Sequence, residues 1–252
     1  KMIEFNNVGL KFGDTRIIED LSFSIKRGEF FCILGPSGCG KSTTLRLIGD
    51  LLNDYSGKIT IAGKSPTECW DQMAYVFQNP RLLPWKNTLD NAAFGLEMRH
   101  PDMSKEIRNE IALKQLTKVG LASDINKMPL MLSGGERQRV SLARALSLKP
   151  EIILMDEPFS ALDPNTRRIL RSQLVQLWQD IGMTIIFVTH DIDEALELGD
   201  RIIVLGTRPS KVEKIINPNE KRPRDVDISD ELRNIKKDLK LVFENLAKTK
   251  VN

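Results

Sequence analysis

The chain has 252 residues, a length that suits one large domain or two small ones. Hydrophobic residues make up 41% and charged residues 28% of it, which is typical of a globular protein and excludes a disordered or fibrous chain. Its net charge of +3 is a small excess, well below the strong basicity of a dedicated nucleic-acid binder, so we expect no nucleic-acid partner.

Short apolar runs alternate with longer helical patterns along the chain. The pattern predicts strands at 3–8, 30–34, 58–61, 74–77, 152–155, 184–188 and 201–205, and helices at 41–51, 104–119, 136–148, 164–181 and 192–198. Because strands that alternate with helices form helix-covered parallel sheets, this order predicts an α/β fold with a mainly parallel core. Turn residues at 12–14 and 62–64 indicate antiparallel hairpins. A nearly all-helical stretch from 83 to 132 indicates an α-helical subdomain, which we place at about 83–150.

The last part of the chain, residues 207–252, is predicted to be a C-terminal extension. Its first half, 207–227, is basic, contains prolines and shows little periodicity. Apolar residues then recur at alternating spacings of four and three, which predicts an amphipathic helix at about 229–247. Such a helix either packs on the domain's own body or serves a regulatory or partner-binding role.

A glycine-rich stretch follows the strand predicted at 30–34 and fits the pattern G-x-x-x-x-G-K-[ST] in a strand–loop–helix context. Its members are Gly35, Pro36, Ser37, Gly38, Cys39, Gly40, Lys41, Ser42 and Thr43. Glycines let backbone N–H groups turn inward around phosphates, and the helix that follows points its positive dipole end at the anion. We expect Lys41 to reach the β- and γ-phosphates of a nucleotide and Ser42 to ligate Mg²⁺. The alternative is a glycine-rich turn that binds nothing.

Two acidic residues, Asp156 and Glu157, follow the strand predicted at 152–155. The carboxyl end of a parallel strand is where such sheets bind ligands. We expect Asp156 to hold Mg²⁺, directly or through water, and Glu157 to polarise the attacking water as a general base. Alone, such a pair more often marks a strand-ending turn, but together with a phosphate loop it indicates a nucleotide-hydrolysing site.

Between these two motifs, residues 132–138 read LSGGERQ. With this run the chain resembles the ATP-binding cassette (ABC) ATPases, whose LSGGQ-type signature it matches. The other landmarks of that family also appear in the expected order along the chain. Gln78 corresponds to the Q-loop glutamine, Asp163 lies in the D-loop run SALD, and His190 in IIFVTHD corresponds to the switch histidine. The resemblance covers about residues 2–206. It implies a P-loop ABC ATPase fold, with a mainly parallel core sheet, an antiparallel β region and a helical subdomain, and it implies ATP and Mg²⁺ as cofactors.

The resemblance also implies a role for each landmark. His190 would contact the γ-phosphate and position the water, although a histidine at a strand end is ordinarily a structural or surface residue. Gln78 would take a catalytic and Mg²⁺-ligating role, and Asp163 would couple two composite sites. Phe12 falls where the family places an aromatic ring that stacks on adenine. Packing in the core is the alternative for Phe12.

The signature residues Ser133, Gly134 and Gly135 precede a helix expected to start near Glu136, so they form a second anion-binding helix N-terminus. One chain has one full phosphate loop, yet this second half-site also needs a phosphate. A two-fold dimer satisfies both, with each Ser133 loop closing over the other chain's γ-phosphate. The family does this head-to-tail, with ATP at the interface, which implies a homodimer here. A simple helix N-cap is the alternative.

An apolar cluster follows Gln78 in a proline-broken loop, at Leu82, Leu83, Pro84 and Trp85. Exposed apolar patches mark binding surfaces, and tryptophan is a favoured anchor there. In transporters of the family this region receives a helix of the membrane permease, which implies a permease contact near 78–85. The alternative is that Trp85 caps the helical subdomain.

The runs FQNPRLLPWKNTLDN and VTHDIDEALELGDRIIVL look most like the importer ATPases of the nitrate/sulfonate/taurine group, which includes uptake of thiamine precursors. Glu136 stands where that group commonly has Met. The resemblance implies an ATP-hydrolysing subunit that energises uptake of a small solute through a separate permease, with an extracytoplasmic solute-binding protein in the complex. One alternative is a non-transport ABC ATPase acting on a soluble macromolecular assembly. Another is a non-catalytic nucleotide sensor with the tail helix as its output.

The location follows from three observations. No apolar run reaches the length of a membrane span, and the N-terminus lacks the pattern of a signal peptide. Three cysteines are too few for a disulfide framework and suggest a reducing compartment. We therefore expect a soluble, cytoplasmic chain. The resemblance to importer ATPases further implies a peripheral protein on the cytoplasmic face of the cell membrane.

Overall fold

The computed structural model of the chain describes residues 1–248 and divides into two compact units. Unit 1 combines Lys1–Trp70 with Met183–Asn252, and unit 2 is the continuous stretch Asp71–Gly182. Of the C-terminal extension predicted at 207–252, residues 249–252 lie outside the described part.

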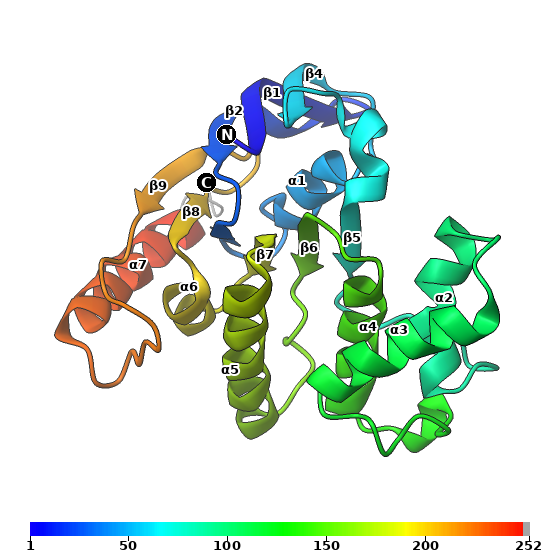
Figure 1. The fold of residues 1–252 in the computed structure, drawn as a ribbon. Coiled ribbons are helices and arrows are strands. Elements are labelled where there is room, and N and C mark those ends of the chain that lie inside the picture. Colours follow the sequence, from blue (N-terminus) through cyan, green and yellow to red (C-terminus); the bar gives the residue numbers. More distant parts are fainter. Residues whose placement is uncertain (249–252) are drawn as a thin grey trace. The chain divides into compact units, whose positions relative to one another are not determined.

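An antiparallel sheet opens unit 1, with strand order β2-β1-β4 (Figure 1). Its strands are β1 (Ile3–Phe12), β2 (Thr15–Ile25) and β4 (Ser56–Ile61). The first two form the hairpin expected at 12–14, because Gly13 takes the left-handed conformation (φ 56°) that a tight turn requires. The turn expected at 62–64 is present, but β4 pairs with β1 and not with the next strand along the chain. The hairpin expected around 57–65 is therefore replaced by a long-range pairing.

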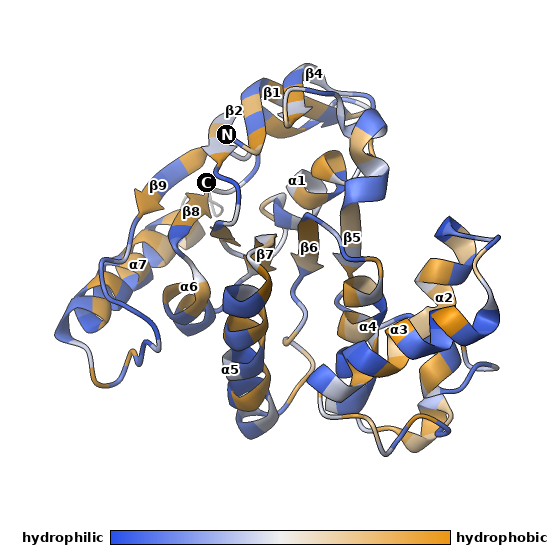
Figure 2. Cartoon of the chain, in the orientation of Figure 1, coloured by the Kyte–Doolittle hydropathy of each residue, from blue (hydrophilic) through white to orange (hydrophobic). Residues whose placement is uncertain are grey.

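The parallel strands of unit 1 hold its phosphate loop. Strand β3 (Phe30–Leu34) lies between β7 (Thr184–Thr189) and β8 (Arg201–Leu205) and runs parallel to both, and β9 (Val212–Ile216) pairs antiparallel with β8. Every residue of β3 and β7 is buried. Helix α1 (Lys41–Ile48) contacts β7, and α6 (Ile192–Leu198) packs on β3. In Figure 2 strands β7 and β8 are coloured mainly hydrophobic, as expected for strands covered on both faces.

Unit 2 contains a parallel strand pair and most of the helices. Strand β5 (Met73–Val76), which follows the 3-10 turns at Pro66–Gln72, pairs in parallel with β6 (Ile152–Asp156). Helices α2 (Thr88–Arg99), α3 (Lys105–Lys118) and α4 (Gly134–Ser147) pack on one another, and α4 contacts β5. The 3-10 turn Pro129–Met131 leads into α4, and α5 (Pro164–Ile181) follows β6. Each of the four helices begins at a side-chain cap: Asn87, Ser104, Ser133 and Asp163 respectively.

The described part of the extension packs on unit 1. Its helix α7 (Asp230–Lys248) contacts α6 and buries Leu232 and Leu239. The ammonium of Lys236 lies 2.7 Å from one carboxylate oxygen of Asp193, in the first turn of α6. The first of the two readings of the tail helix, packing on the domain's own body, therefore describes α7.

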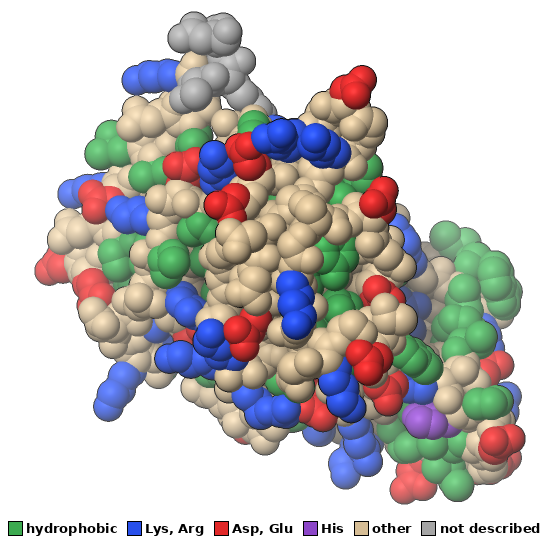
Figure 3. Space-filling model, turned by 90° about the horizontal axis from the view of Figure 1, so that it is seen from above, with side chains coloured by type: hydrophobic (Ala, Val, Ile, Leu, Met, Phe, Trp, Pro, Cys, Tyr) green, Lys and Arg blue, Asp and Glu red, His purple; other side chains and the backbone are tan. Residues whose placement is uncertain are grey.

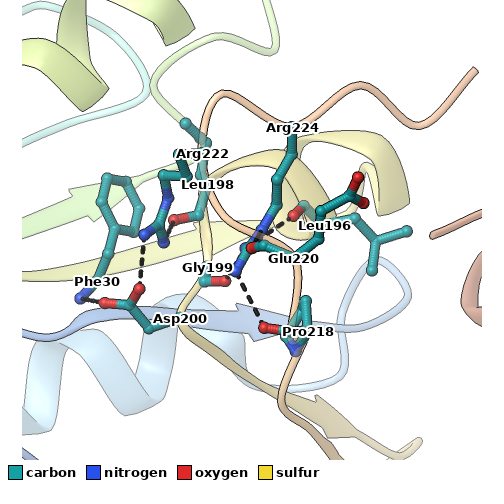
Figure 4. A network of polar contacts seen from close by, with 9 residues as sticks. All are labelled: Phe30, Leu196, Leu198, Gly199, Asp200, Pro218, Glu220, Arg222 and Arg224. Atoms are coloured by element: carbon teal, nitrogen blue, oxygen red, sulfur yellow. Dashed lines mark hydrogen bonds and ion pairs between the residues drawn. The ribbon is translucent and has the colours of Figure 1, made fainter. Parts of the chain in front are cut away.

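Two arginines fasten the extension to the end of α6 (Figure 4). Arg224 donates to the carbonyl oxygens of Leu196 and Gly199 at 3.1 and 2.5 Å, and also to two carbonyls of its own segment. Arg222 donates to the carbonyl of Leu198 and to the carboxylate of Asp200, both at distances of 2.5–2.6 Å. The last carbonyls of a helix have no partner within the helix. Here the extension supplies the donors.

The fold class is therefore the expected one, an α/β P-loop fold with parallel strands, an antiparallel sheet and a helical region. Acidic and basic side chains are interspersed over the face shown in Figure 3. Among residues 1–248, the structure contains no helix that is both long and apolar enough to cross a membrane.

Candidate functional site

The phosphate loop connects β3 to α1 in unit 1. Gly38 and Gly40 have φ of 79° and 103°, which side chains other than glycine rarely adopt. A Cβ on Gly35 would lie 2.7 Å from the Cys39 sulfur and 2.8 Å from a backbone oxygen of β8, so this position also needs glycine. Lys41 is 4% exposed, and its ammonium donates to the carbonyls of Gly35 (2.9 Å) and Pro36 (3.2 Å). The loop has the backbone of a phosphate cradle, with Lys41 held across it.

His190 lies at the same sheet edge of unit 1. Strands β3 and β7 are parallel neighbours with Leu34 opposite Thr189, so the phosphate loop and His190 both leave the carboxyl ends of the strands. The Thr189 hydroxyl donates to the buried carboxylate of Glu194 at 2.6 Å and accepts from the Asp191 N–H at 3.0 Å. These bonds hold the residues on both sides of His190.

Phe12 ends β1, also in unit 1, and its side chain is 52% exposed. This exposure does not fit the alternative of core packing. Stacking on adenine stays a prediction.

The acidic pair lies at the end of β6 in unit 2. Asp156 is the last residue of the strand, and Glu157 takes a left-handed conformation with φ of 42°. For a residue other than glycine this conformation costs on the order of 1–3 kcal/mol, and other residues such as Ala62 and Lys149 adopt it elsewhere in the chain. The left-handed conformation of Glu157 turns the chain directly after Asp156, so the two acidic residues stand at the end of β6.

Gln78 lies at the same edge of unit 2, because it follows β5, the parallel partner of β6. Its Nε2 donates to the Ser160 hydroxyl at 3.0 Å, and that hydroxyl donates to the Glu157 carbonyl at 3.0 Å. The structure thus joins Gln78 to the turn that carries Glu157. Sequence reasoning missed Ser160 as the link, because its only signal was membership of the D-loop run.

The signature loop starts α4 with a reciprocal cap. The Ser133 hydroxyl accepts from the Glu136 N–H at 3.2 Å, and the Glu136 carboxylate accepts from the Ser133 N–H at 2.6 Å. The hydrogen bond from the Ser133 backbone lowers the pKa of Glu136 below its ordinary value. The helix begins at Gly134, slightly earlier than the start near Glu136 expected from the sequence.

The D-loop packs directly against the signature loop. A Cβ on Gly135 would lie 2.6 Å from the Thr166 methyl group, and one on Gly134 would meet Leu162 at 3.7 Å. Asp163 caps α5 by accepting from the Thr166 N–H at 3.0 Å, and hydrogen bonding by Thr166 lowers the pKa of Asp163. Within unit 2 the structure therefore brings the signature and D-loop residues together.

Helix α4 also holds the loop after Gln78. Arg144 donates to the carbonyls of Pro80 (2.7 Å) and Arg81 (3.2 Å), and its burial lowers the pKa of this guanidinium. Gln138 donates to the Phe77 carbonyl at 3.3 Å. No sequence pattern indicates these contacts, since they join residues far apart in the chain. Beyond them, Trp85 is 71% exposed, which does not fit the alternative of a buried cap on the helical subdomain.

The predicted site residues thus form two groups. Unit 1 carries the phosphate loop, His190 and Phe12, and unit 2 carries Gln78, Ser133, Gly134, Gly135, Asp156, Glu157 and Asp163. In the described residues no cluster of three or more His, Cys, Asp or Glu could hold a metal alone.

Comparison with known proteins gives the same family from sequence and from structure. The ABC transporter family matches residues 18–160. The chain is 40% identical over 249 residues to an uncharacterized ABC transporter ATP-binding protein of Methanocaldococcus jannaschii, covering 99% of this chain and 91% of that one. It is 40% identical over 212 residues to the nitrate import ATP-binding protein NrtD of Synechococcus elongatus (82% and 77% covered). The taurine import ATP-binding protein TauB of Escherichia coli K12 is 40% identical over 211 residues (84% and 82% covered).

Among solved structures, an ATP-binding cassette captured as a dimer in a post-hydrolysis state with ADP and Pi superposes with a TM-score of 0.77. It is 34% identical and covers 87% of this chain and 100% of its own. The family match spans the glycine-rich loop, the run LSGGERQ and the acidic pair at 156–157, and the similar structure was solved with ADP and Pi bound. This chain belongs to the ABC transporter family, in which it is an ATP-binding, ATP-hydrolysing subunit.

Proposed function

We propose that this subunit energises the uptake of a small solute, of the nitrate, sulfonate, taurine or thiamine-precursor kind, through a separate membrane permease. The head-to-tail pairing is supported by the presence, in one chain, of a glycine-rich loop and a second helix N-terminus at Ser133. The observation that carries the permease contact is the exposed Trp85 in the loop after Gln78. Relatives named for nitrate and taurine import support the direction and the class of solute. Two copies would pair head-to-tail with ATP at the interface, attached to the cytoplasmic face of the membrane and working with an extracytoplasmic solute-binding protein.

The residues of the chain divide the work of hydrolysis between them. The loop N–H groups and Lys41 bind the phosphates, and Ser133 of the partner subunit closes over the γ-phosphate. Glu157 accepts a proton from the attacking water, while His190 and Gln78 hold that water and the γ-phosphate in line. Asp163, packed beside the signature loop, links the two composite sites of the dimer.

The donor set fits Mg²⁺. Ser42, Gln78 and Asp156 offer a hydroxyl, an amide and a carboxylate, and Mg²⁺ takes oxygen ligands together with phosphates and water. The Nε2 atom of Gln78 is bound to Ser160, which leaves its amide oxygen as the ligand atom. When bound, the ion would neutralise charge that develops on the phosphates.

Two exposed tryptophans make the permease contact testable. The tagged chain is captured from detergent-solubilised membranes of its own host, and co-purifying proteins are identified. We expect a multi-span permease with the wild type and none with Trp85→Asp. The control Trp70→Asp alters a tryptophan that is 59% exposed in unit 1 and should keep the permease. Both variants should keep ATPase activity, because neither residue lies in the predicted nucleotide site.

Two results would contradict the proposal. Recovery of only ribosomal, DNA-repair or other soluble assemblies would favour a non-transport ABC ATPase. Equal permease recovery with Trp85→Asp and wild type would remove residues 78–85 from the interface while leaving the transport function intact.

A further inference from the structure

Ser210 belongs to the C-terminal extension, yet it lies against the phosphate loop. It sits in the segment between β8 and β9, and its side chain is fully buried. Its backbone N–H donates to the Ile17 carbonyl at 2.8 Å, and its carbonyl accepts from the Glu19 N–H at 3.1 Å. These two bonds fix the residue on strand β2 of the same unit, so its side chain has a rigid support.

The Ser210 hydroxyl donates to the backbone carbonyl of Cys39, inside the phosphate loop. The two groups meet closely because the next residue is a glycine: a Cβ on Gly40 would lie 2.6 Å from the Ser210 oxygen. The extension thus reaches the loop at the peptide bond between Cys39 and Gly40.

The direction of that peptide bond decides what the loop offers a phosphate. A trans peptide is planar, with its C=O and N–H pointing to opposite sides. Because the Cys39 carbonyl points to Ser210, the Gly40 N–H points the other way. In a phosphate cradle the N–H groups must face the anion, whereas a carbonyl facing it would repel it.

Because residue 40 is a glycine, steric limits alone do not fix the orientation of the Cys39–Gly40 peptide. Gly40 has φ of 103°, and rotating the preceding peptide by half a turn brings φ to the negative region, which glycine occupies about as readily. The freedom that lets the loop form therefore also lets this peptide turn over. A hydrogen bond on the Cys39 carbonyl removes that alternative.

We propose that Ser210 is a positioning residue of the nucleotide site, whose hydroxyl holds the Cys39–Gly40 peptide with its N–H turned toward the phosphates. The proposal rests on the proposed role of the phosphate loop. A single hydrogen bond of this kind changes an equilibrium by roughly two- to tenfold. Because the loop binds the phosphates before and during hydrolysis, the effect should fall on affinity and leave kcat nearly unchanged.

The test compares Ser210→Ala with a matched control. Ser147 is also a buried serine whose hydroxyl donates to a backbone carbonyl, that of Ala143 at 2.8 Å, but it lies in α4 of unit 2. Titration calorimetry with MgADP should show roughly two- to tenfold weaker binding for Ser210→Ala and wild-type binding for Ser147→Ala. The ATPase KM should rise by the same factor. In ¹⁵N spectra, the Gly40 amide should show exchange between two states in Ser210→Ala alone.

A second variant guards against a folding defect. Ser210→Cys keeps a side chain of similar shape, but its thiol is somewhat larger than the hydroxyl and only a weak donor, so it too should lose affinity. Wild-type MgADP affinity in both Ser210 variants, or equal losses in Ser210→Ala and Ser147→Ala, would overturn the inference. Lys41→Ala distinguishes failure of the phosphate-loop assignment from failure of the Ser210 role. If Lys41→Ala binds MgADP normally, the phosphate-loop assignment is wrong. If Lys41→Ala loses binding while the Ser210 variants keep it, only the role of Ser210 is wrong.

Discussion

Arg224 makes the strongest prediction about stability, because one side chain satisfies four backbone carbonyls. Substitution by alanine would remove donors to Leu196 and Gly199, at the end of α6, and to Pro218 and Glu220, in the extension itself, over distances of 2.5–3.1 Å. A hydrogen bond from a charged group is worth about 1.5–3 kcal/mol, so four would give about 6–12 kcal/mol as an upper limit.

Two effects reduce that limit. Burial lowers the pKa of Arg224, which means that desolvation of the guanidinium already offsets part of the gain. The side chain is also only half-buried, so water would reach some of the abandoned carbonyls. We therefore expect Arg224→Ala to lower the free energy of unfolding by about 3 kcal/mol, in line with the breaking of a buried hydrogen-bond network. For a chain of this size that corresponds to a fall in Tm of about 6–12 °C.

Thermal and urea unfolding followed by circular dichroism measure this loss. Arg233 provides the control, since it donates to Asp227 and Asp230 from an exposed position of the same extension. Arg233→Ala should cost less than about 1 kcal/mol. Arg224→Lys should fall between wild type and Arg224→Ala, because an ammonium cannot reproduce the planar fork. A loss no larger for Arg224→Ala than for Arg233→Ala would refute the reasoning.

Three further predictions concern the nucleotide site and its supports. Glu157→Gln should bind ATP like the wild type but hydrolyse it roughly 10²–10⁴-fold more slowly, as phosphate-release assays would show, and normal turnover would exclude Glu157 as the base. Glu136→Gln keeps the reciprocal cap but removes a negative charge beside a predicted phosphate site, so ATP-driven dimerisation, followed by size-exclusion chromatography, should strengthen several-fold at neutral pH. That gain should fade as the pH falls through the lowered pKa of Glu136, where the wild-type carboxylate becomes neutral, and equal dimerisation at neutral pH would contradict it. Arg144→Met leaves the Pro80 and Arg81 carbonyls without this donor, so hydrogen exchange should accelerate in residues 78–85, and unchanged exchange would mean that α4 does not hold this loop.

Local patterns were sufficient for much of the fold. Strands 30–34 and 201–205 and helices 164–181 and 192–198 have the bounds expected from the sequence. The two strands are short apolar runs between turn residues, and the two helices have a helical period and a capping residue at the start. Strand β9 was missed, since its pattern is short and its pairing with β8 depends on tertiary contact.

The motifs of the site could be predicted for a similar reason, because each is a short run in which spacing determines geometry. The residues that hold these motifs in place could not be predicted. Ser210, Arg144 and Ser160 act on partners distant in sequence or through a turn whose shape only the folded chain shows, so no spacing rule could find them. The left-handed conformation of Glu157 is likewise invisible in the sequence, because glutamate rarely adopts it.

The path of the chain through unit 1 has a consequence for how the protein is made. The chain leaves this unit at Trp70 and returns only at Met183, so β3 emerges from the ribosome without either of its neighbours, β7 and β8. At the usual rate of translation this interval is on the order of ten seconds, during which an entirely apolar strand waits for its partners. Unit 2 is continuous and needs no such wait. The phosphate loop, and Ser210 behind it, are thus among the last parts to be completed. Until then, β3 is an exposed apolar strand of the kind that makes folding intermediates prone to aggregation.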